Sequence, residues 1–259
     1  MILTRENYHS LEANKEYMGV SQVKTFIDCQ ARGLAEVKGE YVRGGSNVAL
    51  LVGSYVDAHF SKGLDLFMAK NQEIFTKSGT LKSPYKNADE IIARIEQDKL
   101  FMDHMAGELQ AIRTGEINGV KFKVMADSLF TDKIVDLKVM RDMKSQYKNG
   151  LYMNFIEFWG YDIQAAIYQE IISNMLGLGN KLPFIIGAAT KEPTTNIALP
   201  SVPQQRMDYC LDLVENLLED IMLVKNGLQE PIRCGKCDYC KQTKKLTEVV
   251  PYDEFFGNN

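Results

Sequence analysis

The sequence lacks any apolar run long enough to cross a membrane. Its longest apolar stretches, such as residues 48–52, are far shorter than the roughly 18 residues that a spanning helix needs. Residues 1–7 also lack the basic and then apolar segments of a secretion signal. Long repeats and low-complexity linkers are absent as well. We therefore expect a cytoplasmic protein with no membrane partner.

The chain also lacks a surplus of basic residues. Its 259 residues carry a formal net charge of −4 and are 45% hydrophobic and 25% charged, a composition typical of a folded protein and not of a disordered or collagen-like one. Proteins that cover nucleic acid nonspecifically normally have excess Lys and Arg, so this charge argues mildly against one. Residues 121–148, however, hold seven Lys or Arg against four Asp, a local charge of +3. The charge therefore does not exclude a nucleic-acid partner, but it predicts a modest intrinsic affinity for one.

Hydrophobic periodicity predicts helices on both sides of a run of strands. Ser21 is a good helix N-cap, and apolar residues follow it at helical spacing. Asn118 and Gly119 form a strong turn signal between two strand-like segments. We expect helices over residues 21–37, 47–69, 88–106, 154–176 and 203–225, and strands over residues 108–116, 120–127, 133–140, 184–190 and 195–199. This order predicts an α/β fold with a mixed central sheet flanked by helices, in one domain over residues 1–259 with a cysteine-containing tail at about 230–259.

Two aspartates and a lysine are predicted to meet on adjacent strands. Asp127 ends one strand, while Asp136 and Lys138 lie two residues apart on the next and so share a face. Such oxygen ligands suit Mg2+, which lowers the pKa of a bound water and neutralises charge on a phosphoryl oxygen. A neighbouring lysine can orient that water. Asp-x-Lys alone is common on solvated strands, and only the upstream aspartate and the strand–turn–strand context favour a metal site.

Polar residues on two predicted helices add to this hypothesis. Asp57 lies among apolar residues on one helical face, where a carboxylate is costly unless it binds a metal or pairs with a lysine at the helix edge. Gly53, one turn earlier, would let this helix approach the sheet closely, and His59 is expected to point elsewhere. Gln164 and Tyr168 are four residues apart and share a face. Those two residues can hold a ligand beside the metal or simply contact the sheet.

Three of the five cysteines lie close together near the C-terminus. Cys234, Cys237 and Cys240 can all reach one metal ion or cluster. In a reducing compartment such a group suggests a metal more than disulfides. Cys210 falls on the apolar stripe of a predicted helix and is expected in the core. The fourth ligand must then come from elsewhere, and zinc, an iron–sulfur cluster and an unliganded tail remain alternatives.

The motifs occur in the order found in the PD-(D/E)XK nuclease superfamily. The similarity covers about residues 20–246 and is greatest to the branch that contains the RecB nuclease domain and the phage-type exonuclease VIII (RecE) domain. It implies a restriction-endonuclease-like core. The segments that resemble the family's motifs are Gly53-x-x-x-Asp57, Asp127, Asp136-Leu137-Lys138 and Gln164-x-x-x-Tyr168.

The resemblance also implies a divalent metal site. Asp127 and Asp136 would ligate Mg2+ or Mn2+ together with the backbone carbonyl of Leu137. Asp57 would assist, although many relatives have His at its position. Cys29 would join the three C-terminal cysteines around a [4Fe–4S] cluster, with Zn2+ as the competing ion.

The remaining implications concern the reaction. Lys138 would position or activate the attacking water, and Gln164 and Tyr168 would lie near the scissile phosphate. The resemblance predicts an exonuclease of phage or prophage recombination type, which degrades duplex DNA ends and exposes single strands for an annealing protein. A homo-oligomer is implied by relatives that form rings. The alternative is a noncatalytic module of the same fold that binds DNA or a recombination partner.

Overall fold

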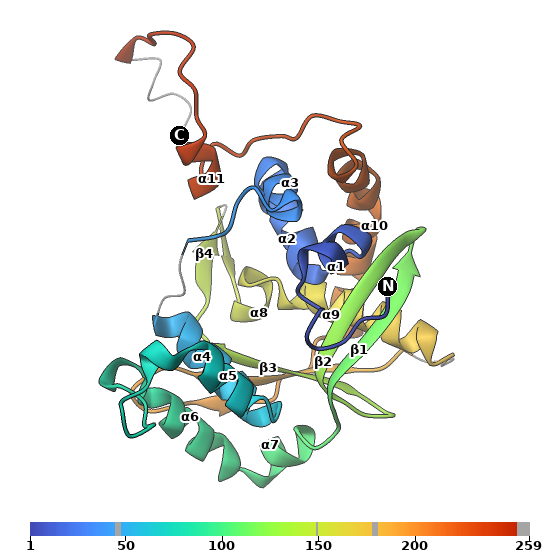
Figure 1. Ribbon diagram of the computed structural model, residues 1–259. Helices are drawn as coiled ribbons and strands as arrows, with labels where there is room; N and C mark the ends of the chain where they lie inside the picture. The colour runs from blue at the N-terminus through green and yellow to red at the C-terminus, as the bar shows by residue number, and fades with distance from the viewer. Residues whose placement is uncertain (45–47, 149, 178–180, 253–259) are drawn as a thin grey trace.

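The structure is a computed structural model that describes residues 1–44, 48–148, 150–177 and 181–252. A five-stranded sheet runs through it in the order β1-β2-β3-β6-β7 (Figure 1). The β3–β6 pair is parallel and the other pairs are antiparallel, which confirms the predicted mixed sheet. The strands are β1 (Glu108–Ile117), β2 (Val120–Leu129), β3 (Ile134–Met140), β6 (Phe184–Thr190) and β7 (Ile197–Ala198), with β4 (Gln146–Lys148) and β5 (Leu151–Met153) as a separate hairpin.

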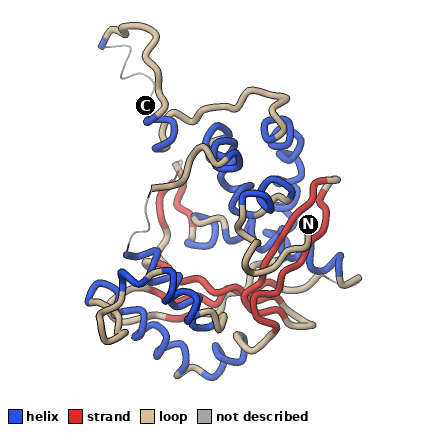
Figure 2. The backbone as a smooth tube through the Cα atoms, viewed as in Figure 1, coloured by secondary structure: helices blue, strands red, loops and turns tan. Residues whose placement is uncertain are grey.

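Helices cover both faces of the sheet (Figures 1 and 2). They are α1 (Leu11–Glu16), α2 (Val20–Asp28), α3 (Gln30–Lys38), α4 (Val48–Phe60), α5 (Leu64–Lys70), α6 (Asn87–Glu96), α7 (Lys99–His104), α8 (Phe155–Phe158), α9 (Tyr161–Met175), α10 (Gln204–Lys225) and α11 (Asp238–Gln242), with short 3-10 turns at Gln72–Ile74 and Ser83–Tyr85. One hydrophobic cluster joins α2, α3, α9 and α10 to β1 and β2 around Phe122 and Ile172. A second joins α4, α6 and α7 to β3 around Val56 and Phe101. In the described part of the chain, no helix combines the length and apolar character needed to span a membrane.

The β1–β2 hairpin follows directly from its sequence. Asn118 and Gly119 both have left-handed φ values, +48° and +76°, as the tight turn of a twisted hairpin requires. Phe122, Val124 and Ala126 alternate along β2 and contribute to the first hydrophobic cluster. The predicted run of three strands is therefore confirmed, and it sets Asp127 close to the start of β3.

The predicted helix over residues 21–37 is wrong in two respects. Its N-cap is Gly19 rather than Ser21, which lies inside α2. The helix is also divided at Cys29, whose extended backbone (φ −167°, ψ 107°) ends α2 and caps α3. Apolar spacing continues across this break because Phe26 and Leu34 pack into the same core. The sequence pattern therefore does not reveal it.

Three other predicted helices are divided as well. Lys62, with φ +58°, lies between α4 and α5, and Gly160, with φ +63°, lies between α8 and α9. Asp98 caps α7 by accepting a hydrogen bond from the backbone N–H of Phe101 at 2.9 Å, which separates α7 from α6. The predicted helix start at Asn47 and the last seven residues of the predicted tail lie outside the described residues.

Candidate active site and metal centre

The predicted acidic residues gather where β2 and β3 separate. These strands pair only through Ser128–Val135 and Leu129–Ile134 and diverge beyond them. β2 continues alongside β1, whereas β3 continues alongside β6. The edge of β3 at Leu137 is therefore not covered by β2, and side chains occupy the fork between the two strands.

Asp127 bridges this fork. Its Oδ2 accepts a hydrogen bond from the backbone N–H of Leu137 at 2.7 Å, and its Oδ1 accepts one from Gln110 Nε2 at 3.0 Å. Because the N–H and C=O of one strand residue point to the same edge, the Leu137 carbonyl also faces the fork. Gln110 has a left-handed φ of +51°, an uncommon conformation for a residue other than glycine. A locally strained backbone thus accompanies one of the contacts to Asp127.

Asp136 is buried and held from two sides. It is 2% exposed, and its Oδ1 accepts a hydrogen bond from Gln164 Nε2 on α9 at 2.7 Å. Its Oδ2 forms an ion pair with the Lys138 ammonium. Lys138 Nζ also lies 5.4 Å from the centre of the Tyr161 ring, where a cation–π interaction is favourable. Gln164 and Lys138 thus both contact Asp136 directly.

Asp57 enters the same region from α4, on one wall of a pocket of about 300 Å³. His59 lies outside this pocket and pairs with Glu96 at 2.8 Å, as expected for a residue that points elsewhere. A Cβ added at Gly53 would meet its nearest neighbours at 3.6 Å or more, so the approach of α4 does not require a glycine there. The pocket is lined by Leu50, Gly53, Ser54, Asp57, Asp127, Leu137, Lys138, Val139 and Lys191.

Asp57, Asp127, Asp136 and Lys138 form what we call the acidic centre. Burial raises the pKa of Asp57 to about 6, with Lys138 opposing and Asp136 adding to the rise. Burial and the two neighbouring carboxylates also raise the pKa of Asp127 well above its usual range. Burial disfavours the charged form of Lys138, but Asp136 and Asp127 outweigh it and raise the pKa of this lysine.

The donor set of the acidic centre fits a hard divalent cation. With all four groups ionised, three carboxylates and one ammonium leave a net charge of −2, which one divalent ion balances. Carboxylate and carbonyl oxygens are also the ligands that Mg2+ and Mn2+ prefer. Burial first, and then the neighbouring carboxylates, disfavour the charged forms of Asp57 and Asp127, and a bound cation would offset both effects.

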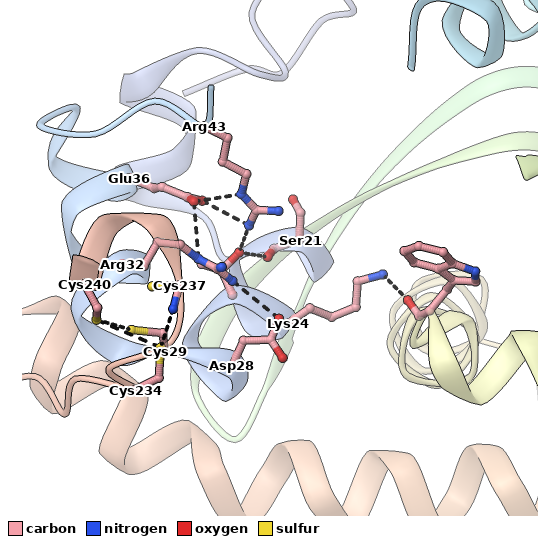
Figure 3. Close-up of polar contacts among 12 residues, drawn as sticks. Ser21, Lys24, Asp28, Cys29, Arg32, Glu36, Arg43, Cys234, Cys237 and Cys240 are labelled. Carbon is pink, nitrogen blue, oxygen red and sulfur yellow. Dashed lines mark hydrogen bonds and ion pairs between the residues drawn. The ribbon is translucent and has the colours of Figure 1, made fainter. Parts of the chain in front are cut away.

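Tyr168 and Lys24 lie beside the acidic centre rather than in its pocket. The Tyr168 hydroxyl donates to the Met125 carbonyl of β2 at 3.0 Å, and burial raises the pKa of this phenol. Lys24 Nζ donates to the Trp159 carbonyl at 2.9 Å (Figure 3). Burial, and then the charge of Lys138, lower the pKa of Lys24 to about 8. Through its hydrogen bond to Met125, Tyr168 fixes α9 on β2, one helical turn from Gln164.

The four cysteines named by the resemblance meet in a second cluster (Figure 3). Cys29 at the α2–α3 break and Cys240 on α11 are buried, with their Sγ atoms 3.6 Å apart. Cys234 Sγ lies 3.9 Å from Cys240 Sγ, and all four sulfur atoms lie within 4.8 Å of one another. Cys210 is buried in the first hydrophobic cluster, as predicted. We refer to Cys29, Cys234, Cys237 and Cys240 as the cysteine cluster.

The thiols of the cysteine cluster differ in acidity. Burial favours the neutral thiol of Cys234, but the N–H groups of Cys237 and Lys236 outweigh it and lower the pKa of Cys234 to about 6, whereas burial raises the pKa of Cys29 and of Cys237. Thiolates are the form that binds metal. Ile232 N donates to Gln30 Oε1 at 2.9 Å, and Ala31 N donates to the Ile232 carbonyl at 3.1 Å. These contacts join the C-terminal segment to the start of α3.

Comparison with known proteins assigns the family. Residues 19–243 match the model described as "PDDEXK-like domain of unknown function (DUF3799)". The chain belongs to this family. A crystal structure named "Putative exonuclease", from Eubacterium rectale, is 42% identical, with 100% of each chain covered and a TM-score of 0.93. The structure of SSO0001 is 16% identical over 82% of this chain and 91% of its own, with a TM-score of 0.31, and a search of curated proteins gives no match.

Membership in the PDDEXK-like family confirms the predicted superfamily and its mixed α/β core. The chain thus has a nuclease fold, and its acidic centre lies where the motif residues were expected to converge. Sequence reasoning missed Gln110, Lys24 and Lys191. None of the three belongs to a motif, and only the fold brings them to the acidic centre.

Proposed function

We propose that this protein is a metal-dependent DNA exonuclease of phage or prophage recombination type. It would hydrolyse phosphodiester bonds at duplex ends and expose single strands. The observation that carries the proposal is the convergence of Asp57, Asp127 and Asp136 with Lys138 at the β2–β3 fork of a PDDEXK-like chain. The full-length similarity to a protein named as an exonuclease supports the choice of reaction.

Each residue of the acidic centre then has a distinct role. Asp127, Asp136 and the Leu137 carbonyl, assisted by Asp57, would hold Mg2+ or Mn2+, which supplies an activated water and neutralises phosphoryl charge when bound. Burial disfavours the charged form of Lys138, but Asp136 and Asp127 outweigh it and raise its pKa in the metal-free protein. Lys138 would position or activate the attacking water and donate to the developing negative charge.

Gln164 and Tyr168 act through other groups in this proposal. Gln164 donates to Asp136 Oδ1 and so fixes the orientation of the carboxylate, leaving Oδ2 to Lys138. Tyr168 donates to the β2 backbone two residues before Asp127. The two residues thus hold the two halves of the fork at a fixed separation from α9, next to the scissile phosphate.

For the cysteine cluster we propose a single Zn2+ ion. Four ligands around one Zn2+ with Zn–S bonds of about 2.3 Å place their sulfur atoms about 3.8 Å apart. The observed separations of 3.6 Å and 3.9 Å match that spacing. A [4Fe–4S] cluster inserts an iron atom between each thiolate and the cluster body, and so spreads the four sulfur atoms wider.

The nuclease proposal is tested by following linear and covalently closed circular duplex DNA with Mn2+ present. We expect the linear DNA to be degraded from its ends and the circle to remain intact. Asp136→Asn and Lys138→Ala should abolish degradation. Lys133→Ala is the matched control, because Lys133 lies on the same β2–β3 hairpin outside the pocket and pairs with Asp132.

The outcomes separate the candidate functions. Cleavage of the circle would replace exonuclease by endonuclease action. DNA binding with no Mn2+-dependent cleavage would favour the noncatalytic module. Full activity of the Asp136 and Lys138 variants would refute the assigned site. Under this proposal the products serve a single-strand annealing protein, and bound metal and a homo-oligomer that encloses the duplex supplement the modest affinity of a chain with a net charge of −4.

A further inference from the structure

Lys191 reaches the acidic pocket from a part of the chain that carries none of the motifs. It follows the last residue of β6, and its backbone N–H donates to the Met140 carbonyl at the end of β3 at 2.8 Å. Its side chain lines the same pocket as Asp57, Asp127 and Lys138. Its Nζ lies over Gly53 of α4, 3.6 Å from the position of an added Cβ.

Lys191 differs from Lys138 in having no acidic partner. Lys138 is paired with Asp136, whereas no carboxylate or carbonyl among the described residues makes a hydrogen bond or ion pair with the Lys191 ammonium. Lys191 is nevertheless half-buried, and burial lowers its pKa. A partly buried ammonium without a partner is unfavourable for folding. A purely structural role therefore does not account for its position.

We propose that Lys191 binds a phosphate of the DNA strand being cleaved, next to the scissile bond. This inference rests on the proposed nuclease function. With a divalent cation balancing the acidic centre, the Lys191 ammonium gives the pocket a net charge of +1. This charge matches the single negative charge of a phosphodiester. Lys191 thus contributes affinity for the strand, while Lys138 and the acidic residues carry the chemistry.

The proposal predicts which kinetic constant changes. Replacing Lys191 by Gln removes the charge but keeps a side chain of similar length. We expect KM for linear duplex DNA to rise about tenfold and kcat to change less than about threefold, because a phosphate contact made before and during the reaction affects binding. The slope of log affinity against log salt should become shallower by about one unit, as for the loss of one phosphate contact. Lys191→Arg should restore most of the affinity.

The control and the stability measurement separate this role from a structural one. Lys99→Gln removes an exposed lysine on α7, which pairs with Asp103, and should change neither KM nor the salt slope. The Lys191→Gln protein should be no less stable to heat than the wild type, because the lost ammonium has no partner. An unchanged KM and salt slope in an active Lys191→Gln enzyme would overturn this inference alone. Absence of DNA cleavage by the wild type would overturn the proposed function and this inference together.

Discussion

The acidic centre and the cysteine cluster both join distant parts of the chain, but the fold supports them differently. The acidic centre lies within the packed sheet and helices, where Asp127 and Asp136 already hold protein hydrogen bonds. The cysteine cluster joins a helix break at Cys29 to a C-terminal segment whose only described helix is the five-residue α11. The first site should therefore keep its shape without metal, whereas the second should depend on its ion.

This difference predicts what each of the two proposed metals would contribute. Removing the ion from the acidic centre should stop the reaction and leave the fold. Removing it from the cysteine cluster should release the C-terminal segment from α3 and lower stability, because binding energy at a structural site is folding energy.

The largest expected effect is on the reaction. Asp136→Asn should lower kcat by about a thousandfold, since metal binding and the Lys138 contact are lost together. The midpoint of thermal unfolding should shift by less than about 3 °C, because Gln164 can still donate to the amide oxygen and Asp127 remains beside the Lys138 ammonium. Rate assays measure the loss of kcat, and calorimetry on the same preparation measures the unfolding midpoint. A large loss of stability would place Asp136 in a structural role instead.

The second effect is on stability. Cys29→Ala should remove the bound ion and lower the free energy of unfolding by about 4 kcal/mol, or roughly 8–16 °C in the unfolding midpoint. Cys210→Ala removes an equally buried thiol outside the cluster and should keep the ion. Metal analysis of the wild type and of the two variants shows which proteins bind the ion. We expect one zinc per chain in the wild type and in Cys210→Ala, and none in Cys29→Ala. Iron and sulfide in the wild type, with absorbance near 400 nm, would refute the zinc proposal.

The third effect is a pH dependence of metal binding. Asp57 has a raised pKa of about 6, so in the metal-free protein its contribution to stability is present at low pH and is lost as pH rises through about 6. A divalent cation binds the deprotonated carboxylate. Its affinity should therefore rise about tenfold between pH 5 and pH 7. The Mn2+-induced increase in unfolding temperature, measured across this range, checks the prediction.

Asp57→Asn is the matched test of that assignment. The variant should show weaker Mn2+ binding and a flatter pH profile above pH 5. Because Asp127 also has a raised pKa, some dependence should remain. A profile identical to that of the wild type would remove Asp57 from the ligand set and leave Asp127 and Asp136 as the carboxylates of the site.

The smallest effect concerns the contact to Asp127. Gln110→Gly should change stability by less than about 1 kcal/mol, because the relief of the left-handed φ of +51° is offset by the lost hydrogen bond to Asp127. The same change removes the amide contact and should lower kcat/KM about five- to tenfold. Lys62→Gly, at an exposed left-handed position with φ +58°, should give a stability gain and no loss of activity. Equal activity of both variants would show that Gln110 does not support the site.

The strands and the acidic motif were predictable because their signals are local. Alternating residues and the Asn118–Gly119 turn predict the hairpin, and two-residue spacing places Asp136 and Lys138 on one side of β3. The divergence of β2 from β3 was not predictable, because their pairing ends after two residue pairs and no glycine or proline in either strand marks that point. Only pairing with β1 and β6 determines where they separate.

Short elements and single contacts were the parts that sequence reasoning missed. Helix α1 has six residues and the β4–β5 strands have three each, too few to produce a clear period. The break at Cys29 is hidden because both flanking helices pack into one core. Lys191 and Gln110 belong to no sequence motif, because their proposed roles depend on neighbours that are far away in the sequence.

The proposed divalent metal at the β2–β3 fork can be located directly by the anomalous difference density of crystals soaked in Mn2+. We expect a strong peak in contact with Asp127, Asp136 and the Leu137 carbonyl, and the loss of that peak in Asp136→Asn crystals. A wild-type crystal saturated with Mn2+ at pH 7.5 that shows no peak at the fork would contradict this proposal.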